Sequence, residues 1–387
     1  MTARVSNIAV LGSTGSIGQS ALSVIAASEG RLRAVALSAH TSTDLLARQA
    51  ADVRPTWAVV TDAAAAERQD WSALPAGTAL EVGTAALEAV VSRPEVDIVL
   101  AAIVGSAGLR STWAALEAGK TVALANKETL VMAGSLVMAL AARRGARILP
   151  VDSEHSAVFQ ALQAGQRDEV RRIVLTASGG PFRTYSAARM ASVTVDEALA
   201  HPTWDMGPKI TVDSATMMNK ALEIIEARWL FNVDVDQIDV LIHPQSIVHS
   251  MVEYVDGSVV AQLGPPDMKL PIHYALTYPD RMPSVAAKMN WRQAMRLEFE
   301  PPDVERFPAL EFGREAARAG GTTGAVLNAA NEAAVAEFLQ GELGFADIVP
   351  ACRSVMAHHD FDPSPTLEEL IRLDRWARQE VARWVCT

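Results

Sequence analysis

The sequence predicts an α/β protein that begins with a Rossmann-like, doubly wound parallel sheet. Short apolar β-type runs alternate with helical stretches over residues 1–150, as expected for strands that are buried on both faces. A glycine-rich turn follows the first of these runs. Beyond residue 155 the alternation stops. We therefore expect a central α+β domain with a mixed sheet, followed by a C-terminal helical bundle.

The chain of 387 residues is too long for one ordinary hydrophobic core. The alternating pattern fills residues 1–150, the mixed pattern fills 151–278, a proline-rich linker covers 279–303, and helical patterns fill 304–387. No polar cluster in the last segment has ligand spacing, so we assign the bundle a structural role.

The individual elements follow from local patterns. Strands of the first sheet are expected at residues 8–11, 34–37, 57–60, 98–101, 121–124 and 148–149. Later strands are expected at 173–176, 238–242, 248–254 and 258–263, with Asp256-Gly257 as the hairpin turn between the last two. Helices are expected from residue 19 and over 213–226, 323–339 and 367–384.

The loop after the first strand predicts a dinucleotide site. Gly12, Gly15 and Gly18 are spaced as G-x-x-G-x-x-G between a strand and a helix. Glycines permit positive φ and close backbone approach, and a helix N-terminus offers N–H groups to a pyrophosphate. The alternative is a plain tight turn. We favour dinucleotide binding because the motif has the structural context that the mechanism requires.

Residues at the end of the second strand favour NADP over NAD. An NAD site usually places an acidic residue there to bind the ribose 2′-hydroxyl. Here Ser38, His40, Thr41 and Ser42 precede the first acid, Asp44. Hydroxyl groups and a histidine suit a 2′-phosphate better than a carboxylate does.

Asn126, Lys127 and Glu128 follow the strand predicted at 121–124. Ligands of open α/β sheets bind beyond the carboxyl ends of the strands, so we expect these residues at the nicotinamide end of a cleft. The structural alternative is a helix start, with Asn126 as the cap and Glu128 in the first turn. The two interpretations are compatible.

The segment Val151-Asp152-Ser153-Glu154-His155 carries candidate metal ligands. It follows an apolar run, so we expect its start to be extended, with Asp152 and Glu154 on the same side. Two such carboxylates repel unless a proton or a cation lies between them, and hard divalent ions such as Mg²⁺ or Mn²⁺ take oxygen ligands of this kind. The alternative is a solvated turn.

Two later loops are candidates for ligand contact. The small-residue loop that begins at Ser178 suits an anion or a simple turn. The segment from His201 to Lys209 places Trp204 and Met206 among prolines and a glycine. Large apolar side chains on a loop suggest a lid that closes over a ligand, and the alternative is that both pack inward.

The helix predicted at 213–226 combines a cap with a polar cluster. Ser214 is a good helix cap, and Asn219, Lys220 and Glu223 lie within about one turn. A surface ion pair between Lys220 and Glu223 would explain the spacing. The same residues would also form an anion pocket beside a carboxylate that completes a metal site. His243 and His249 are more typical of core or edge residues than of catalysts.

Composition excludes several classes of partner. A net charge of -11 argues against nucleic acid and against an anionic membrane surface as a partner. The two cysteines, Cys352 and Cys386, provide no disulfide framework, which is typical of a reducing cytosol. The longest uncharged run, 129–142, is too short to span a bilayer, and we expect no signal peptide. A cytoplasmic location is expected.

The motifs at 12–18, 126–128, 152–155, 178–182 and 201–226 resemble, in order and over essentially the whole chain, those of the 1-deoxy-D-xylulose 5-phosphate reductoisomerase family. The resemblance implies a homodimer with an NADPH-binding domain, a catalytic domain and a helical bundle. It also implies one divalent metal, Mg²⁺ or Mn²⁺. The implied reaction converts 1-deoxy-D-xylulose 5-phosphate to 2-C-methyl-D-erythritol 4-phosphate in non-mevalonate isoprenoid synthesis.

The resemblance also implies roles for individual residues. The catalytic residues would be Lys127, Asp152, Glu154 and Glu223, of which the three acids bind the metal. Substrate contacts would come from Lys127, Ser153, Glu154, Ser178, His201, Trp204, Ser214, Asn219, Lys220 and Glu223. Cofactor contacts would come from Thr14, Gly15, Ser16, Ile17, Asn126, Glu128 and Gly207. The chain departs from the family at His40-Thr41-Ser42, where a Gly-Lys-Asn type segment is common, and at Pro208, where a basic residue is common.

Two other functions stay open at this point. One is a metal-independent NADP-dependent dehydrogenase of the semialdehyde or hydroxy-acid type, in which the carboxylates act as acid and base. The other is a non-catalytic sensor that binds a sugar phosphate and NADPH without consuming either.

Overall fold

The computed structural model describes residues 5–386, which form two compact units. The first unit contains residues 5–129, 137–156 and 267–287. The second contains residues 130–136, 157–266 and 288–386. The boundaries predicted from the sequence for three domains and a linker remain predictions.

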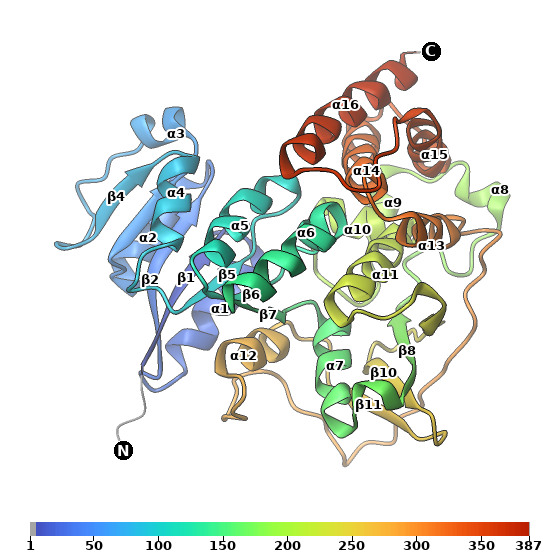
Figure 1. Cartoon of the computed structure of the whole chain (residues 1–387), viewed down its shortest axis with the longest axis horizontal. Helices are drawn as coiled ribbons and strands as arrows, with labels where there is room; N and C mark the ends of the chain where they lie inside the picture. Colours follow the sequence, from blue (N-terminus) through green and yellow to red (C-terminus); the bar gives the residue numbers. More distant parts are fainter. Residues whose placement is uncertain (1–4, 387) are drawn as a thin grey trace. The chain divides into compact units, whose positions relative to one another are not determined.

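The strands of the described residues form two sheets (Figure 1). The strands are β1 (Ser6–Leu11), β2 (Leu32–Ala39), β3 (Trp57–Val60), β4 (Ala79–Val82), β5 (Ile98–Ala101), β6 (Thr121–Leu124), β7 (Arg147–Pro150), β8 (Val170–Ala177), β9 (Ile238–Ile242), β10 (Val248–Tyr254) and β11 (Val259–Leu263).

The α-helices of the described chain begin after the glycine loop and continue to its last residues. They are α1 (Ser16–Ala26), α2 (Thr43–Val53), α3 (Ala63–Arg68), α4 (Thr84–Val91), α5 (Leu109–Glu117), α6 (Glu128–Arg144), α7 (Ser153–Ala161), α8 (Ala187–Met190), α9 (Val195–Leu199), α10 (Pro208–Ala215), α11 (Met218–Phe231), α12 (Lys269–Thr277), α13 (Ala309–Ala319), α14 (Thr323–Gln340), α15 (Ile348–His358) and α16 (Leu367–Val385). Among these described helices, none is both long and apolar enough to cross a membrane.

The sheet of the first unit is parallel and doubly wound, which confirms the predicted fold class. Its strand order is β4-β3-β2-β1-β5-β6-β7. The order reverses between β1 and β5, so right-handed crossovers place α1 to α3 on one face and α4 and α5 on the other. The glycine loop after β1 therefore lies at the switch point, where α/β sheets bind their ligands.

One strand of this sheet was not predicted from the sequence. β4 lies at the edge, and its residues are exposed or half-buried. An edge strand needs no continuous apolar run, so the pattern that predicts buried strands fails there. Helix α12 was also not predicted in this unit; it packs beside α1 after a long excursion of the chain.

The second unit contains the predicted mixed sheet and helical bundle. Its strand order is β11-β10-β8-β9, with β8 and β9 parallel and the other pairs antiparallel. Burial alternates along β9 and in the second half of β10, as expected for a sheet with one covered face. The predicted hairpin joins β10 to β11 around Gly257, whose φ is +87°.

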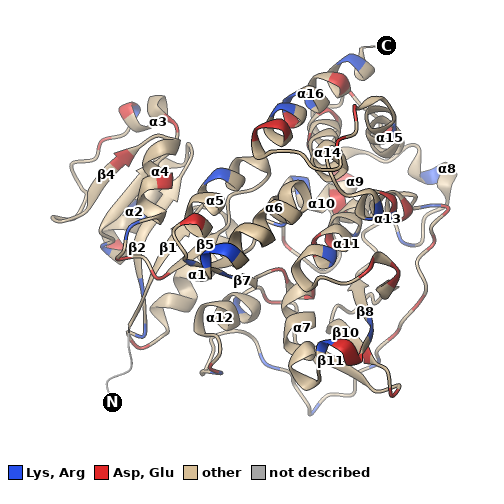
Figure 2. Ribbon diagram, viewed as in Figure 1, with Lys and Arg blue, Asp and Glu red and all other residues tan. Residues whose placement is uncertain are grey.

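Helices α14 and α16 of the bundle are held together by buried apolar residues and by one ion-pair network. Figure 2 shows acidic and basic residues interspersed along α16. Arg378 in α16 pairs with Asp374 one turn earlier, at 3.0 Å, and with Glu332 in α14, at 2.6 Å. Burial lowers the pKa of Arg378, but these two carboxylates outweigh it and raise the pKa overall.

Helix α13 packs against α11 at a glycine. A Cβ atom on Gly313 would lie 2.7 Å from the Cα of Ala221 and 2.8 Å from its carbonyl oxygen. Both are backbone atoms, so the two helices would have to separate to admit a side chain. The absence of a Cβ therefore sets how closely α13 covers the polar helix α11.

We predict that Gly313→Ala lowers the free energy of unfolding by about 1–2 kcal/mol. Overpacking costs about 1–3 kcal/mol, and contact with rigid backbone atoms places Gly313 in the upper part of that range. Alanine gains only roughly 1 kcal/mol over glycine in a helix. Urea titration would measure the change. Ala319→Ser, at an exposed position of the same helix, is the control and should change stability little. An unchanged midpoint for Gly313→Ala would contradict the tight contact.

Candidate active site

The glycine loop is built to bring backbone close to a ligand. Gly12 has a φ of +72°, and a Cβ there would lie 2.7 Å from the carbonyl oxygen of Ala102. Gly18 is buried against the backbone of the same loop. Gly15 is the N-cap of α1 and makes no side-chain cap bond, so the N–H groups of the first helical turn point to the loop without a side-chain acceptor. This arrangement fits a pyrophosphate.

The predicted cofactor residues differ in accessibility. Thr14, Gly15, Ser16 and Ile17 are exposed or half-buried at the start of α1. Ser38 is 1% exposed, and its hydroxyl accepts the N–H of Gly12 at 3.0 Å. Ser38 therefore holds the glycine loop, whatever else it contacts.

His40 follows β2 and is exposed. Its Nδ1 lies 3.0 Å from the hydroxyl of Thr61. The ring therefore stands at the surface beyond the carboxyl end of the strand, which suits the predicted contact to a 2′-phosphate.

Asn126, Lys127 and Glu128 are all buried beyond the end of β6. The amide of Asn126 donates to the carbonyl oxygens of Ile103, at 2.6 Å, and Gly105, at 3.0 Å, and to Glu128, at 3.1 Å. The predicted cap role of Asn126 is wrong, because Lys127 is the N-cap of α6; Glu128 does lie in the first turn, as predicted, and the Asn126 side chain instead fixes the loop after β5.

The acidic segment is not extended, which corrects the prediction. β7 ends at Pro150 and α7 begins at Ser153. The Oδ1 atom of Asp152 accepts the N–H of Glu154 at 3.3 Å, and its carbonyl accepts the N–H of Ser156 at 2.8 Å. Asp152 therefore precedes the helix as a cap, and Glu154 lies in the first turn, where the helix dipole favours negative charge.

Asp152 is held as a carboxylate by its neighbours. Lys127 forms an ion pair with it, and Nδ1 of His155 lies 3.8 Å from its Oδ1. Burial opposes ionisation, but Lys127 and His155 outweigh burial and hold the pKa of Asp152 well below its usual range. The Ser153 hydroxyl donates to Glu154 at 2.5 Å. Two carboxyl groups thus stand at one helix start in the first unit.

In the second unit, Ser178 and His201 are brought together. Ser178 follows β8, and its hydroxyl lies 3.1 Å from Nε2 of His201. Nδ1 of His201 accepts the backbone N–H groups of Thr203 and Trp204, at 3.1 and 2.9 Å. Nδ1 is therefore unprotonated, Nε2–H donates to Ser178, and burial lowers the pKa of His201 in agreement.

Ser214 lies beside the Ser178 loop. A Cβ on Gly180, whose φ is +67°, would lie 2.6 Å from the carbonyl oxygen of Ser214. The predicted cap role of Ser214 is wrong, because it lies in the last turn of α10. The helical path breaks at Met217, which has a φ of +63°, and the hydroxyl of Thr216 accepts the N–H of Met218 as α11 begins.

The polar cluster of α11 is buried, so its interpretation as a surface ion pair is wrong. Lys220 is 3% exposed and Glu223 is fully buried. Lys220 forms an ion pair with Glu223, and the amide of Asn219 donates to the other carboxylate oxygen at 2.7 Å. Burying a lysine and a carboxylate costs several kcal/mol of desolvation per ion. Stability alone does not explain such a pair.

His249 lies next to this cluster, and the sequence pattern gave no reason to place it there. Its ring centroid is 6.3 Å from that of Trp204, and the charge of Lys220 is near enough to disfavour its protonation. Burial is the largest cause and, despite hydrogen bonds to the carbonyls of Pro265 and Gly264, lowers the pKa of His249 to about 4. The ring is therefore neutral at pH 7.

We predict that His249 makes the protein less stable in acid. Its folded-state pKa lies below the usual value of 6.5, so between these values the unfolded state binds more protons and stability rises with pH. Lowering the pH from 7 to 5 should remove about 2 kcal/mol through this residue. Urea titration of the protein and of His249→Asn at both pH values isolates the effect. Equal pH dependence of the two proteins would contradict the low pKa.

Comparison with known proteins identifies the family. Three family models match the chain: "1-deoxy-D-xylulose 5-phosphate reductoisomerase" over residues 8–134, the corresponding C-terminal domain over 148–231, and the "DXP reductoisomerase C-terminal domain" over 263–380. The protein of that name from Heliobacterium modesticaldum is 52% identical over 377 residues, covering 97% of this chain and 96% of its own length. The chain belongs to the 1-deoxy-D-xylulose 5-phosphate reductoisomerase family.

Solved structures of this reductoisomerase family have the same fold. The enzyme from Zymomonas mobilis in complex with NADPH is 43% identical, with a TM-score of 0.92 over 99% of both chains. A complex with NADPH, fosmidomycin and magnesium is 41% identical, with a TM-score of 0.92 over 98% of both chains. The relative from Pelotomaculum thermopropionicum is 53% identical over 96% of both chains.

The predicted reductoisomerase residues therefore fall into two local groups. The first unit holds the glycine loop, the residues after β6, and Asp152 with Ser153 and Glu154. The second unit holds Ser178, His201, Trp204, Gly207, Ser214, Asn219, Lys220 and Glu223. Gly207 is exposed and is the N-cap of α10. The roles of these residues remain predictions.

Proposed function

We propose that this chain is an NADPH- and divalent-metal-dependent reductoisomerase that converts 1-deoxy-D-xylulose 5-phosphate to 2-C-methyl-D-erythritol 4-phosphate. The observation that carries the proposal is identity of about half the residues over nearly the full length of the named relatives. A solved relative is a complex with NADPH, fosmidomycin and magnesium. The reaction belongs to non-mevalonate isoprenoid synthesis.

The cofactor is assigned to the first unit. Thr14, Gly15, Ser16 and Ile17 would hold the pyrophosphate at the start of α1, where the local geometry fits an anion. Asn126, Glu128 and Gly207 are proposed to contact the rest of the cofactor, and Ser38 and His40 the 2′-phosphate. When bound, NADPH supplies the hydride that reduces the rearranged sugar.

The metal is assigned to Asp152, Glu154 and Glu223. All three offer carboxylate oxygens, the donors that Mg²⁺ and Mn²⁺ prefer. Asp152 is ionised in the fold, so it is ready to bind a cation. When bound, the metal acts as a Lewis acid toward vicinal oxygens of the substrate. The fit of the donor set supports this ligand assignment.

The remaining residues position the substrate. Ser178, Ser214, Asn219 and Lys220 are proposed to bind its phosphate, with His201 directing the Ser178 hydroxyl through Nε2–H. Phosphate binding at a distance from the reacting carbons supplies energy for holding both fragments in place. Lys127, Ser153 and Glu154 would contact the sugar. Trp204 would cover the site and exclude water.

Two further properties are proposed, a homodimer and a cytoplasmic location. The family resemblance implies a homodimer, which analytical ultracentrifugation would test. The acidic composition and the pair of cysteines favour the cytoplasm.

We predict that NADPH absorbance falls when the protein is mixed with 1-deoxy-D-xylulose 5-phosphate and Mg²⁺ or Mn²⁺. Chelating the metal should stop the reaction, and adding it back should restore the rate. A rate that survives chelation would favour the metal-independent dehydrogenase. Binding of NADPH and the sugar phosphate without any loss of absorbance would favour the sensor.

We predict that Asp152→Asn and Glu223→Gln each lower kcat by at least about a hundredfold. Loss of a residue that only hydrogen-bonds to a metal ligand already lowers activity or metal affinity by roughly 10- to 100-fold. NADPH binding should stay nearly intact, because the glycine loop is untouched. Fluorescence titration of the reduced nicotinamide would check this control. Near-normal turnover in either variant would remove that residue from the ligand set.

We predict that Lys220→Ala raises KM for the phosphorylated sugar by about 10- to 100-fold, the range expected for a lost charge-assisted hydrogen bond. KM for NADPH is the internal control and should change little. A variant with a lower kcat and an unchanged substrate KM would argue that Lys220 acts through Glu223 instead of through the phosphate.

A further inference from the structure

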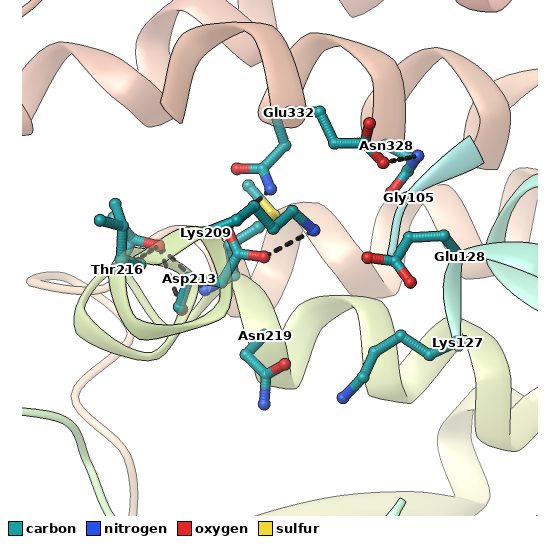
Figure 3. Close-up of polar contacts among 12 residues, drawn as sticks. Gly105, Lys127, Glu128, Lys209, Asp213, Thr216, Asn219, Asn328 and Glu332 are labelled. Atoms are coloured by element: carbon teal, nitrogen blue, oxygen red, sulfur yellow. Dashed lines mark hydrogen bonds and ion pairs between the residues drawn. The ribbon is translucent and has the colours of Figure 1, made fainter. Parts of the chain in front are cut away.

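Asp213 is a buried carboxylate whose function the proposed reaction has not used. It lies in α10 and is 1% exposed. One oxygen pairs with Lys209 Nζ at 2.8 Å, and the other accepts the amide N–H of Asn331 at 2.8 Å. Figure 3 shows Lys209 reaching Asp213, and Thr216 bonded to the backbone of Asp213. We call Lys209, Asp213 and Asn331 the Asp213 anchor.

The anchor joins two helices at defined points. Lys209 and Asp213 lie one turn apart in α10, and Asn331 is fully buried in α14. Each bond to the carboxylate is charge-assisted and therefore directional. An exposed i,i+4 pair is worth only a few tenths of a kcal/mol, whereas a buried one carries a desolvation cost. The anchor therefore fixes the position of α10 along α14 more than it adds stability.

The position of α10 matters because two proposed substrate-binding parts, Ser214 and the Trp204 segment, are attached to it. Ser214 is the residue after Asp213, and its carbonyl is in tight contact with Gly180 of the Ser178 loop. The segment 202–206, which contains Trp204, ends at Gly207, the N-cap of α10. Its other end is held by His201, which bonds Ser178. A shift of α10 would therefore move Ser214 and one end of the Trp204 segment together.

We propose that Asp213 is a positioning residue for the phosphate end of the substrate, acting by holding α10 against Asn331 so that Ser214 and the Trp204 segment are correctly placed. The inference rests on the proposed function and goes beyond its residue set. Asp213 touches neither the phosphate nor the reacting carbons in this account. Its effect is exerted through Ser214 and through the loop that ends at α10.

The test compares Asp213→Asn, Lys209→Met and the double variant by steady-state kinetics and thermal unfolding. Asp213→Asn should raise KM for 1-deoxy-D-xylulose 5-phosphate by about tenfold, the order expected for loss of a charge-assisted bond. The kcat, and the KM for NADPH, should stay within about twofold of the values of the unmutated protein, because only binding of the sugar phosphate is weakened. Lys209→Met should raise the same KM and also lower Tm, since it removes one partner of a buried carboxylate.

The double variant separates positioning from stability. Removing both charges leaves no uncompensated carboxylate, so Tm should recover toward that of the unmutated protein. The raised KM for the sugar phosphate should persist, because the charged carboxylate that accepts the Asn331 amide and links α10 to α14 is still absent. Asp374→Asn is the matched control. Asp374 is also a buried aspartate that pairs with a basic residue four positions later, Arg378, and Arg378 forms an ion pair with Glu332 of α14. This variant should lower Tm and leave KM unchanged.

A substrate KM that follows Tm across all four variants, Asp374→Asn included, would overturn the proposal, since the anchor would then act only through stability. An unchanged KM in Asp213→Asn would overturn it as well. Both results leave the reductoisomerase assignment standing. Absence of turnover by the unmutated chain would instead overturn the proposed function and, with it, this inference.

Discussion

A buried carboxylate paired with a lysine is the interaction on which the candidate site depends. Asp152 has Lys127 in the first unit, and Glu223 has Lys220 in the second. The desolvation of both charges in such a pair often exceeds their attraction, and apolar replacements are frequently as stable. Each of these two pairs therefore lowers the free energy of unfolding through desolvation, and hydrogen bonds and packing around the pair must offset that cost.

The surroundings of Glu223 show how this is done. Met217 has a left-handed backbone conformation, which ends the helical path of α10 and lets α11 begin as a separate helix. In the first turns of α11, Asn219 and Lys220 lie beside Glu223. Gly313 lets α13 approach the backbone of Ala221 and cover this helix. Close cover excludes water, which strengthens the ion pair and raises the cost of removing either partner.

The sequence predicted what depends on local pattern and missed what depends on tertiary contact. Buried parallel strands are apolar runs, so the sheet around β1 was predictable, whereas the edge strand β4 was not. The Asp-x-Glu spacing suggested an extended pair, but Asp152 caps α7, because its side chain accepts a backbone N–H one residue into the helix. His249 joins the polar cluster of α11 only through folding, and a single histidine carries no spacing signal that would reveal it.

The lysine partners also bear on how a cation would be bound. A carboxylate buried without a positive neighbour would have a raised pKa, and it would need to release a proton before it could bind a metal. Lys127 instead holds Asp152 deprotonated despite burial. The carboxylate is therefore charged in advance, and a divalent ion bound there would compete with an ammonium group rather than with a proton. Such competition would keep the affinity for a cation moderate, and no proton has to leave Asp152 before a cation binds.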